Sequence, residues 1–97
     1  MHILRMNKID PERYPEVVAK MRELGAPVIQ VFALSSWEYF ALEGSHRLTA
    51  AKELGLTPIL DVVADMSDLT KEDDDQGILQ QAERRRLKGL SIWFPPA

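Results

Sequence analysis

The sequence predicts a small α+β domain with a mixed β-sheet. Segments rich in β-branched and aromatic residues alternate with segments whose apolar residues recur at helical spacing, and glycines stand where the helices should end. Two strand-like segments are separated only by Ser35 and Ser36, which predicts an antiparallel hairpin. The expected order is therefore strand, helix, strand, strand, helix, strand (β-α-β-β-α-β), followed by a C-terminal helix.

The length limits the domain organisation. A chain of 97 residues with 45% apolar content supports one domain with one modest core. We expect the main α+β core in residues 1–65 and a C-terminal helical extension of the same domain in residues 66–97.

Charge and cysteine content restrict the classes of function. The formal charge of -3 does not favour a general attraction to nucleic acid, which depends on Lys and Arg. The absence of cysteine excludes disulfides and thiol chemistry. No apolar segment resembles a signal peptide or a membrane span, so we expect a cytoplasmic protein without membrane contact.

The first strand and helix are expected in residues 1–25. Residues 1–9 mix apolar and polar residues as a short strand does, and Asp10-Pro11 offers a helix cap followed by proline at the first helical position. Gly25 is expected to close the helix as a left-handed cap. The apolar stripe of this helix consists of Tyr14, Val17, Val18, Met21 and Leu24.

Three more strands and one helix follow. Residues 28–34 are almost continuously apolar, which predicts an interior strand covered on both faces. Residues 37–42 form the return strand of the hairpin, in which Trp37, Tyr39 and Phe40 are expected to pack. A second helix in residues 45–54 ends at Gly55, and residues 58–64 form the fourth strand.

The C-terminal third begins acidic and becomes basic, the order that a helix dipole favours. We therefore predict a third helix whose Ile78, Leu79, Ala82 and Leu87 face the core or a partner. The run Asp73-Asp74-Asp75 lacks the spacing of a calcium loop and is expected to be solvated or to start the helix. Arg84-Arg85-Arg86 is expected to form a solvated helix end. Residues 91–96 are too apolar for a solvated tail, so they should dock on their own domain or, as the alternative, across a homodimer.

The sequence Gly44-Ser45-His46-Arg47 at the start of the second helix predicts a phosphate site. Unpaired N–H groups and the positive end of the helix dipole meet there. Gly44 permits close approach of an anion, and Arg47 supplies a counter-charge. The alternative for Arg47 is a salt bridge to Glu43.

Neighbouring side chains have both binding and structural interpretations. The hydroxyl of Ser45 can cap the helix, which we favour, or contact a phosphate oxygen. His46 can donate to phosphate when it is protonated, or its ring can cap its own helix or form a cleft wall. Thr49 lies near the N-terminus of the same helix, but its hydroxyl can also form a hydrogen bond back along the helix. Neither the two histidines nor the acidic residues predict a metal site made of protein ligands.

The motif and its surroundings resemble the ParB/sulfiredoxin-like superfamily (the ParB-like N-terminal nuclease domain family). The resemblance rests on a strand, Gly-x-His-Arg, a helix with an Ala-Ala-x-x-Leu-Gly exit and a Pro-led strand, and it covers about residues 1–65. It implies that a nucleotide (CTP, ATP or ADP), with or without Mg²⁺, binds at Gly44–Arg47. Ser45 stands where sulfiredoxins carry their catalytic cysteine, so repair of sulfinic acids by that route is excluded.

The resemblance leaves three hypotheses for function. The first is a nucleotide-binding module, a small single-domain member of the superfamily, in which aromatic residues near the site can stack on the base. The second is a nucleotide-dependent phosphotransferase or NTPase, in which Glu43 holds Mg²⁺ through water or acts as a general base, as in related serine kinases. The third is a non-enzymatic protein- or DNA-interaction module of a phage or plasmid. Too few residues follow Asp65 for the DNA-binding and dimerisation regions of partition proteins, so DNA contact would need a partner or a fused domain.

Overall fold

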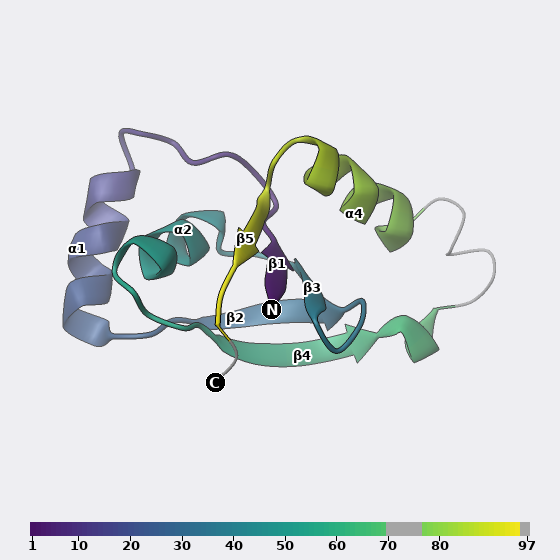
Figure 1. Ribbon diagram of the computed structural model, residues 1–97. Helices are drawn as coiled ribbons and strands as arrows, with labels where there is room; N and C mark the ends of the chain where they lie inside the picture. Colours follow the sequence, from purple (N-terminus) through teal and green to yellow (C-terminus); the bar gives the residue numbers. More distant parts are fainter. Residues whose placement is uncertain (70–76, 96–97) are drawn as a thin grey trace.

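The chain folds around a mixed five-stranded sheet, which confirms the predicted α+β class (Figure 1). The computed structural model describes residues 1–69 and 77–95. In sheet order the strands are β4 (Ile59–Asp65), β2 (Val28–Ala33), β3 (Glu38–Ala41), β1 (His2–Leu4) and β5 (Ser91–Trp93). The described helices are α1 (Tyr14–Leu24), α2 (Ser45–Glu53) and α4 (Ile78–Leu87), with a 3₁₀ turn, η1 (Met66–Asp68), after β4.

The predicted hairpin is confirmed, and its neighbours make the sheet mixed. β2 and β3 are antiparallel, and the N–H groups of Leu34 and Ser35 both donate to the carbonyl oxygen of Glu38 in the connection. β4 runs parallel to β2, and β1 runs parallel to β3. β1 is shorter than residues 1–9, because the chain leaves the sheet after Leu4 and continues as a loop to α1.

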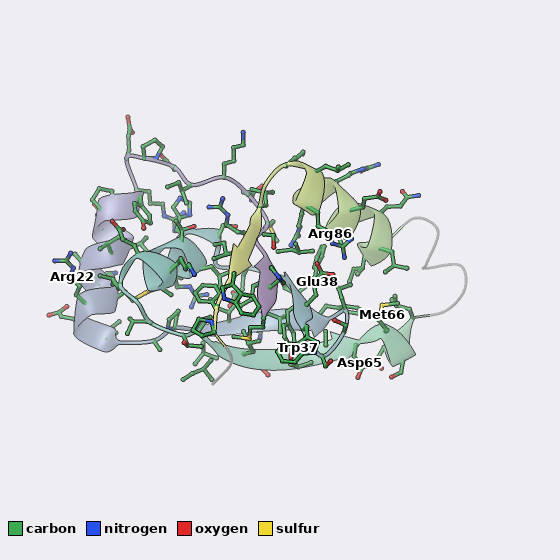
Figure 2. The ribbon with its side chains drawn as sticks, viewed as in Figure 1. Arg22, Trp37, Glu38, Asp65, Met66 and Arg86 are labelled. Atoms are coloured by element: carbon green, nitrogen blue, oxygen red, sulfur yellow. The ribbon has the colours of Figure 1, made fainter. Side chains whose placement is uncertain are left out.

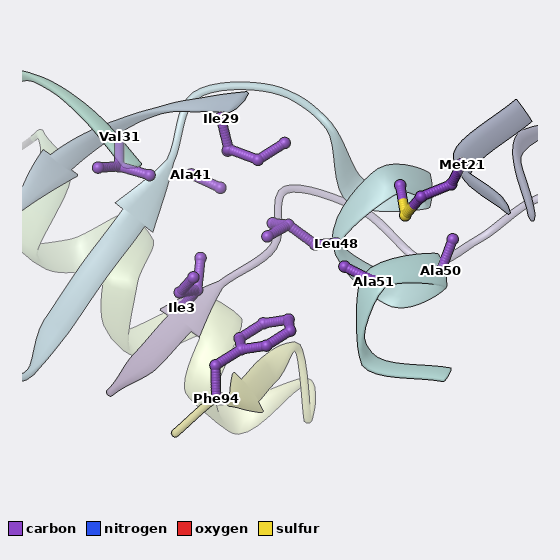
Figure 3. Close-up of a cluster of buried hydrophobic side chains, with 9 residues drawn as sticks. All are labelled: Ile3, Met21, Ile29, Val31, Ala41, Leu48, Ala50, Ala51 and Phe94. Carbon is purple, nitrogen blue, oxygen red and sulfur yellow. The ribbon is translucent and has the colours of Figure 1, made fainter. Parts of the chain in front are cut away.

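The C-terminal segment forms a strand that the sequence did not predict. β5 pairs antiparallel with β1, so the expected docking on the same domain is confirmed. The N–H of Phe94 donates to the carbonyl oxygen of Met1 at 2.9 Å, and the Phe94 ring is only 1% exposed. The extension that we expected to be helical therefore ends in a strand that covers β1 and contributes a large side chain to the core (Figure 3).

Each face of the sheet has its own core. Because successive strand residues point to opposite faces, Ile3 packs under α1 and α2 whereas Leu4 packs under α4. The core under α1 and α2, drawn in Figure 3, consists of Ile3, Met21, Ile29, Val31, Ala41, Leu48, Ala50, Ala51 and Phe94. The smaller core under α4 consists of Leu4, Phe32, Phe40 and Ala82.

The start of α1 differs from the prediction. The helix begins at Tyr14, not at Pro11. Pro15 has no N–H to donate to the carbonyl of Pro11, so a helical hydrogen bond at this point cannot form. Asp10 instead stabilises the preceding turn: its Oδ1 accepts from the N–H of Glu12 (3.0 Å), and its carbonyl oxygen accepts from the N–H of Tyr14 (3.0 Å).

The end of α1 confirms the glycine but corrects its conformation. The N–H of Gly25 donates to the carbonyl oxygen of Met21 at 2.8 Å. Its angles of φ 80° and ψ -157° lie outside the left-handed helical region, in a region that glycine adopts readily. The predicted apolar stripe is buried at Met21, whereas Leu24 is 81% exposed.

β2 is not covered on both faces along its whole length, as we had expected. Ile29 and Val31 are buried under α1 and α2, whereas Val28 is 52% exposed and Gln30 is also exposed on the opposite face. Phe32, further along the strand, is buried. The reason is that α4 covers only the part of this face that lies near β1 and β3 (Figure 1).

The third helix is confirmed, and its inward face matches the prediction in part: Ala82 is buried and Ile78 packs against the core under α4. Ala82 and Arg85 are buried, whereas Leu87 is 81% exposed. Residues 78, 82 and 85 are spaced by four and three, so they share a face that excludes Leu87. The acidic residues 72–75 lie outside the described part of the chain.

The arginine run of α4 is not uniformly solvated, as we had predicted. Arg84 is exposed, but the guanidinium of Arg85 is buried against the sheet. Arg86 forms an ion pair with Glu38 of β3, with 2.8 Å between Nε and Oε2, and Figure 2 shows the two side chains directed toward each other. Two of the three arginines therefore attach the helix to the sheet.

Candidate functional site

The turn into α2 needs glycine at position 44. Gly44 occupies the N-cap position with φ 79° and ψ 30°, a left-handed conformation that L side chains rarely adopt. A Cβ there would lie 2.7 Å from Cδ1 of Ile29 and 3.3 Å from an Nη atom of Arg47. No side chain caps α2, so the amide groups of its first turn have no side-chain acceptor.

A cleft of about 510 Å³ lies between α1 and the N-terminus of α2. One side is largely apolar and comes from α1 and the turn that follows it. The other side is the Gly44–Arg47 turn. The lining residues are Arg13, Val17, Lys20, Met21, Leu24, Gly25, Ala26, Pro27, Gly44, Ser45, His46 and Arg47.

The charged residues that line the cleft are all cations. Arg13, Lys20 and Arg47 line it together with His46, and no Asp or Glu is among the lining residues. The whole chain has a formal charge of -3, so this concentration of positive charge does not follow from composition. Together with the helix N-terminus, it makes the cleft attractive to an anion.

Arg47 forms a salt bridge with Glu43, which was the alternative interpretation of this residue. One of its Nη atoms lies 2.9 Å from Oε1 of Glu43, and the other donates to the carbonyl oxygen of Val28 at 3.2 Å. The two paired side chains are 40% and 46% exposed. An ion pair this exposed is weak, so a bound anion can compete with Glu43 for the guanidinium.

Ser45 does not cap the helix, which corrects the interpretation that we favoured. Gly44 occupies the N-cap position, so Ser45 is the first residue within the helix. Its side chain is directed toward the loop between β1 and α1, where Oγ accepts a hydrogen bond from the N–H of Asn7 at 2.9 Å. The residue is only 7% exposed.

His46 and Thr49 also attach α2 to this loop. Nε2 of His46 accepts from the N–H of Asp10 at 2.8 Å. Thr49 bonds back along the helix, its Oγ1 donating to the carbonyl oxygen of Ser45 at 2.9 Å, and it also accepts from Arg5 at 2.9 Å. Of the predicted phosphate ligands, Gly44, Ser45, His46 and Arg47 line the cleft, and Thr49 does not.

Two cleft cations, Arg13 and Lys20, were missed by the sequence analysis. The signal for them was present: residues 13, 17, 20 and 24 are spaced by four, three and four, which places them on one side of a helix. The sequence gives no sign, however, that this side of α1 approaches the start of α2. That relation depends on how the two helices pack.

The aromatic residues of the hairpin do not lie at this cleft. Phe40 is buried in the core under α4. Trp37 is 59% exposed, which corrects the expectation that it packs in the hairpin. With Tyr39, it lines a separate hollow formed also by Met1 and Pro58. Neither aromatic side chain is placed to stack on a base bound beside Gly44.

Metal ligands, membrane spans and relatives give no further guide to the site. Among residues 1–69 and 77–95, no group of three or more His, Cys, Asp or Glu side chains is arranged to hold a metal ion. In the same part of the chain, no helix is long and apolar enough to cross a membrane. Comparison of the chain with protein-family models, with curated proteins and with solved structures found no match.

Proposed function

We propose that this protein is a nucleotide-binding module that holds the phosphates of a nucleotide at the N-terminus of α2. The observation that carries the proposal is the cleft, whose charged lining residues are Arg13, Lys20 and Arg47 without a carboxylate among them. Phosphates bind well where cationic side chains and the uncapped amides of a helix N-terminus converge. Gly44, in its left-handed conformation, forms the turn that leads into this N-terminus.

The apolar side of the cleft supports a nucleotide over a simple inorganic anion. Val17, Leu24 and Ala26 line the cleft, are not buried, and offer a surface for the flat face of a base or for a ribose. The volume of about 510 Å³ falls within the usual range of small-molecule sites, about 300–1,000 Å³. A ligand with an anionic end and a flat apolar end would use both sides of the cleft.

The resemblance to ParB/sulfiredoxin-like proteins supports the same proposal. The Gly-x-His-Arg turn lies between a strand and a helix, and the chain then continues to β4 beside β2. CTP, ATP and ADP are the candidate ligands that this resemblance suggests, with or without Mg²⁺.

A thermal-shift panel tests the proposal. The ligands are CTP, ATP, ADP, GTP and inorganic tripolyphosphate, each with and without Mg²⁺. A ligand at about 100 times its Kd stabilises a protein by about 2.7 kcal/mol, which raises the Tm of a domain of this size by several degrees. A shift by one nucleotide and a smaller shift by tripolyphosphate are the expected result.

Lys20→Ala and Arg22→Ala form a matched pair for this experiment. Both residues are exposed and lie on α1, but Lys20 lines the cleft whereas Arg22 does not. Figure 2 shows Arg22 on the outer side of α1. Both variants lose one positive charge, so only a specific site distinguishes them. Lys20→Ala should reduce the shift and Arg22→Ala should preserve it. No shift with any nucleotide would contradict the proposal and favour the interaction-module hypothesis.

A further inference from the structure

In the described part of the chain, three side chains of α2 bond to the loop between β1 and α1, and His46 is the titratable one among them. Ser45 accepts from the N–H of Asn7, and Thr49 accepts from Arg5, through hydroxyl groups that do not change charge near neutral pH. His46 accepts from the N–H of Asp10 through Nε2 at 2.8 Å. Imidazole is the side chain that ordinarily gains a proton between pH 8 and pH 5.

The hydrogen bond from Asp10 exists only when His46 is neutral. A ring nitrogen accepts a hydrogen bond only through a lone pair, so the proton of the neutral ring lies on Nδ1. In the protonated ring both nitrogens carry hydrogen, and Nε2–H would then face the N–H of Asp10. Two donors in this position repel each other, so protonation must break the contact.

Asp10 connects this contact to the wall of the cleft. Its carbonyl oxygen accepts from the N–H groups of Arg13 (3.2 Å) and Tyr14 (3.0 Å), so it fixes the turn that leads into α1. Arg13 lines the cleft. Residues 10–13 are all exposed, so little apolar burial holds this turn in place.

We infer that His46 is a pH-sensitive latch for the second half of the β1–α1 loop. The neutral ring holds Asp10, and with it Arg13, against the start of α2. The protonated ring releases residues 8–13, while Asn7 stays attached through Ser45. The inference requires no ligand, so its test is independent of nucleotide binding.

The charges around His46 come from three segments. Asp10 and Arg13 belong to the loop, Lys20 to α1 and Arg47 to α2 itself. Release of the loop carries Arg13 and the Asp10 carboxylate away from the imidazolium together, so the opening is driven by the repulsion between the two N–H donors and not by the removal of a like charge.

Amide hydrogen exchange measured by NMR between pH 5 and pH 8 tests the latch. A His2→Gln background leaves His46 as the only imidazole, because the chain has two histidines. After correction for the intrinsic pH dependence of exchange, the protection of the Asp10 and Arg13 amides should fall about two- to tenfold as His46 gains its proton, as expected for the loss of one hydrogen bond. The Asn7 amide is the internal reference and should keep its protection.

The variant His46→Gln provides the matched control, because an amide oxygen accepts a hydrogen bond without titrating. Protection of Asp10 in this variant should not change across the same pH range. Nitrogen chemical shifts of the wild-type ring should also place the neutral proton on Nδ1. The inference would be overturned if the neutral ring carried its proton on Nε2, or if the exchange protection of the Asp10 amide did not change as His46 is protonated. It would also be overturned if protection changed at Asp10 but not at Arg13, or if it changed equally in His46→Gln.

Discussion

The guanidinium carbon of Arg85 lies 3.5 Å from the centroid of the Phe40 ring, on the face of the sheet opposite to the cleft. One Nη atom of Arg85 also donates to the carbonyl oxygens of Leu4 (3.0 Å) and Ala41 (2.7 Å). Burial lowers the pKa of Arg85 to about 10. A cation on α4 thus joins β1 and β3 through their backbones, and its ring contact offsets part of the cost of burying the charge.

Replacement of Arg85 by Met should lower the free energy of unfolding by about 2 kcal/mol. The variant keeps much of the side-chain volume but leaves two buried carbonyl groups without this donor, and each unsatisfied group costs about 1–3 kcal/mol before the gain from removing a buried charge. Urea unfolding measures the effect. Arg84→Met, at an exposed position, is the matched control and should stay within about 0.5 kcal/mol of the wild type. Equal stability of the two variants would contradict a clamping role for Arg85.

Gly44→Ala should destabilise the protein more than Gly55→Ala. Both glycines have positive φ, 79° and 70°, so both substitutions carry a conformational cost of about 1–2 kcal/mol. At Gly44 the new Cβ would in addition lie 2.7 Å from Cδ1 of Ile29, whereas at Gly55 nothing lies within 4 Å. The difference between the two variants in urea unfolding therefore measures the crowding around position 44, which comes from Ile29 and, at 3.3 Å, from Arg47.

The substitution Ile29→Val removes Cδ1, the atom that would lie too close to the new Cβ in Gly44→Ala. A double-mutant cycle should therefore show that Gly44→Ala costs less in the Ile29→Val background than in the wild type. Additive effects would mean that the side chain of Ile29 moves aside freely, and that this contact does not contribute to the requirement for glycine.

Tyr14 should make stability fall at alkaline pH. Burial, a hydrogen bond to Glu53 at 2.5 Å and the charge of that carboxylate together raise the pKa of Tyr14 to about 12 from its usual value of 10.0. The folded state therefore holds more protons than the unfolded state above pH 10. The stabilisation is fully present below that pH and is lost as the pH rises toward about 12.

Tyrosinate absorbance measures this titration directly. The chain has two tyrosines, so Tyr39→Phe leaves the signal of Tyr14 alone. The midpoint should lie near 12. Glu53→Gln should lower it only in part, because burial is the largest cause of the raised pKa. A midpoint near 10 in the Tyr39→Phe variant would mean that Tyr14 is not held against α2.

The local elements of the fold were predictable because each has a local cause. Gly25 and Gly55 end helices, and Ser35 and Ser36 separate two strands that pair with each other. β5 was not predictable in the same way. Three residues carry no recognisable pattern, and their strand conformation depends on the free edge of β1, which lies at the other end of the chain.

The site shows the same division between local and long-range causes. The start of α2 directly after Gly44, with Arg47 in its first turn, follows from the order of residues along the chain. The role of Ser45 does not, because its hydroxyl bonds to Asn7, which lies 38 positions earlier in the sequence. Burial of Arg85 was likewise missed, since nothing within the run Arg84-Arg85-Arg86 indicates which member faces the sheet.

Glu43→Gln separates the binding hypothesis from the enzymatic one. In the structure Glu43 competes with any anion for Arg47, since the two side chains are 2.9 Å apart. The neutral variant should therefore bind the nucleotide or tripolyphosphate more tightly than the wild type. An exposed ion pair contributes about 0.2–1 kcal/mol, which corresponds to an increase in affinity of about 1.5- to 5-fold.

Glu83→Gln on α4 is the control for this comparison, because it makes the same change in net charge on the opposite face of the sheet. It should leave the affinity unchanged. If Glu43 instead holds Mg²⁺ or acts as a general base, Glu43→Gln should abolish turnover of the nucleotide, and the affinity measured with Mg²⁺ should not rise. Titration calorimetry and a phosphate-release assay on the same two variants distinguish these outcomes. If Glu43→Gln binds the nucleotide more tightly and neither the wild type nor the variant turns it over, the role of Glu43 is to compete with the bound anion for Arg47.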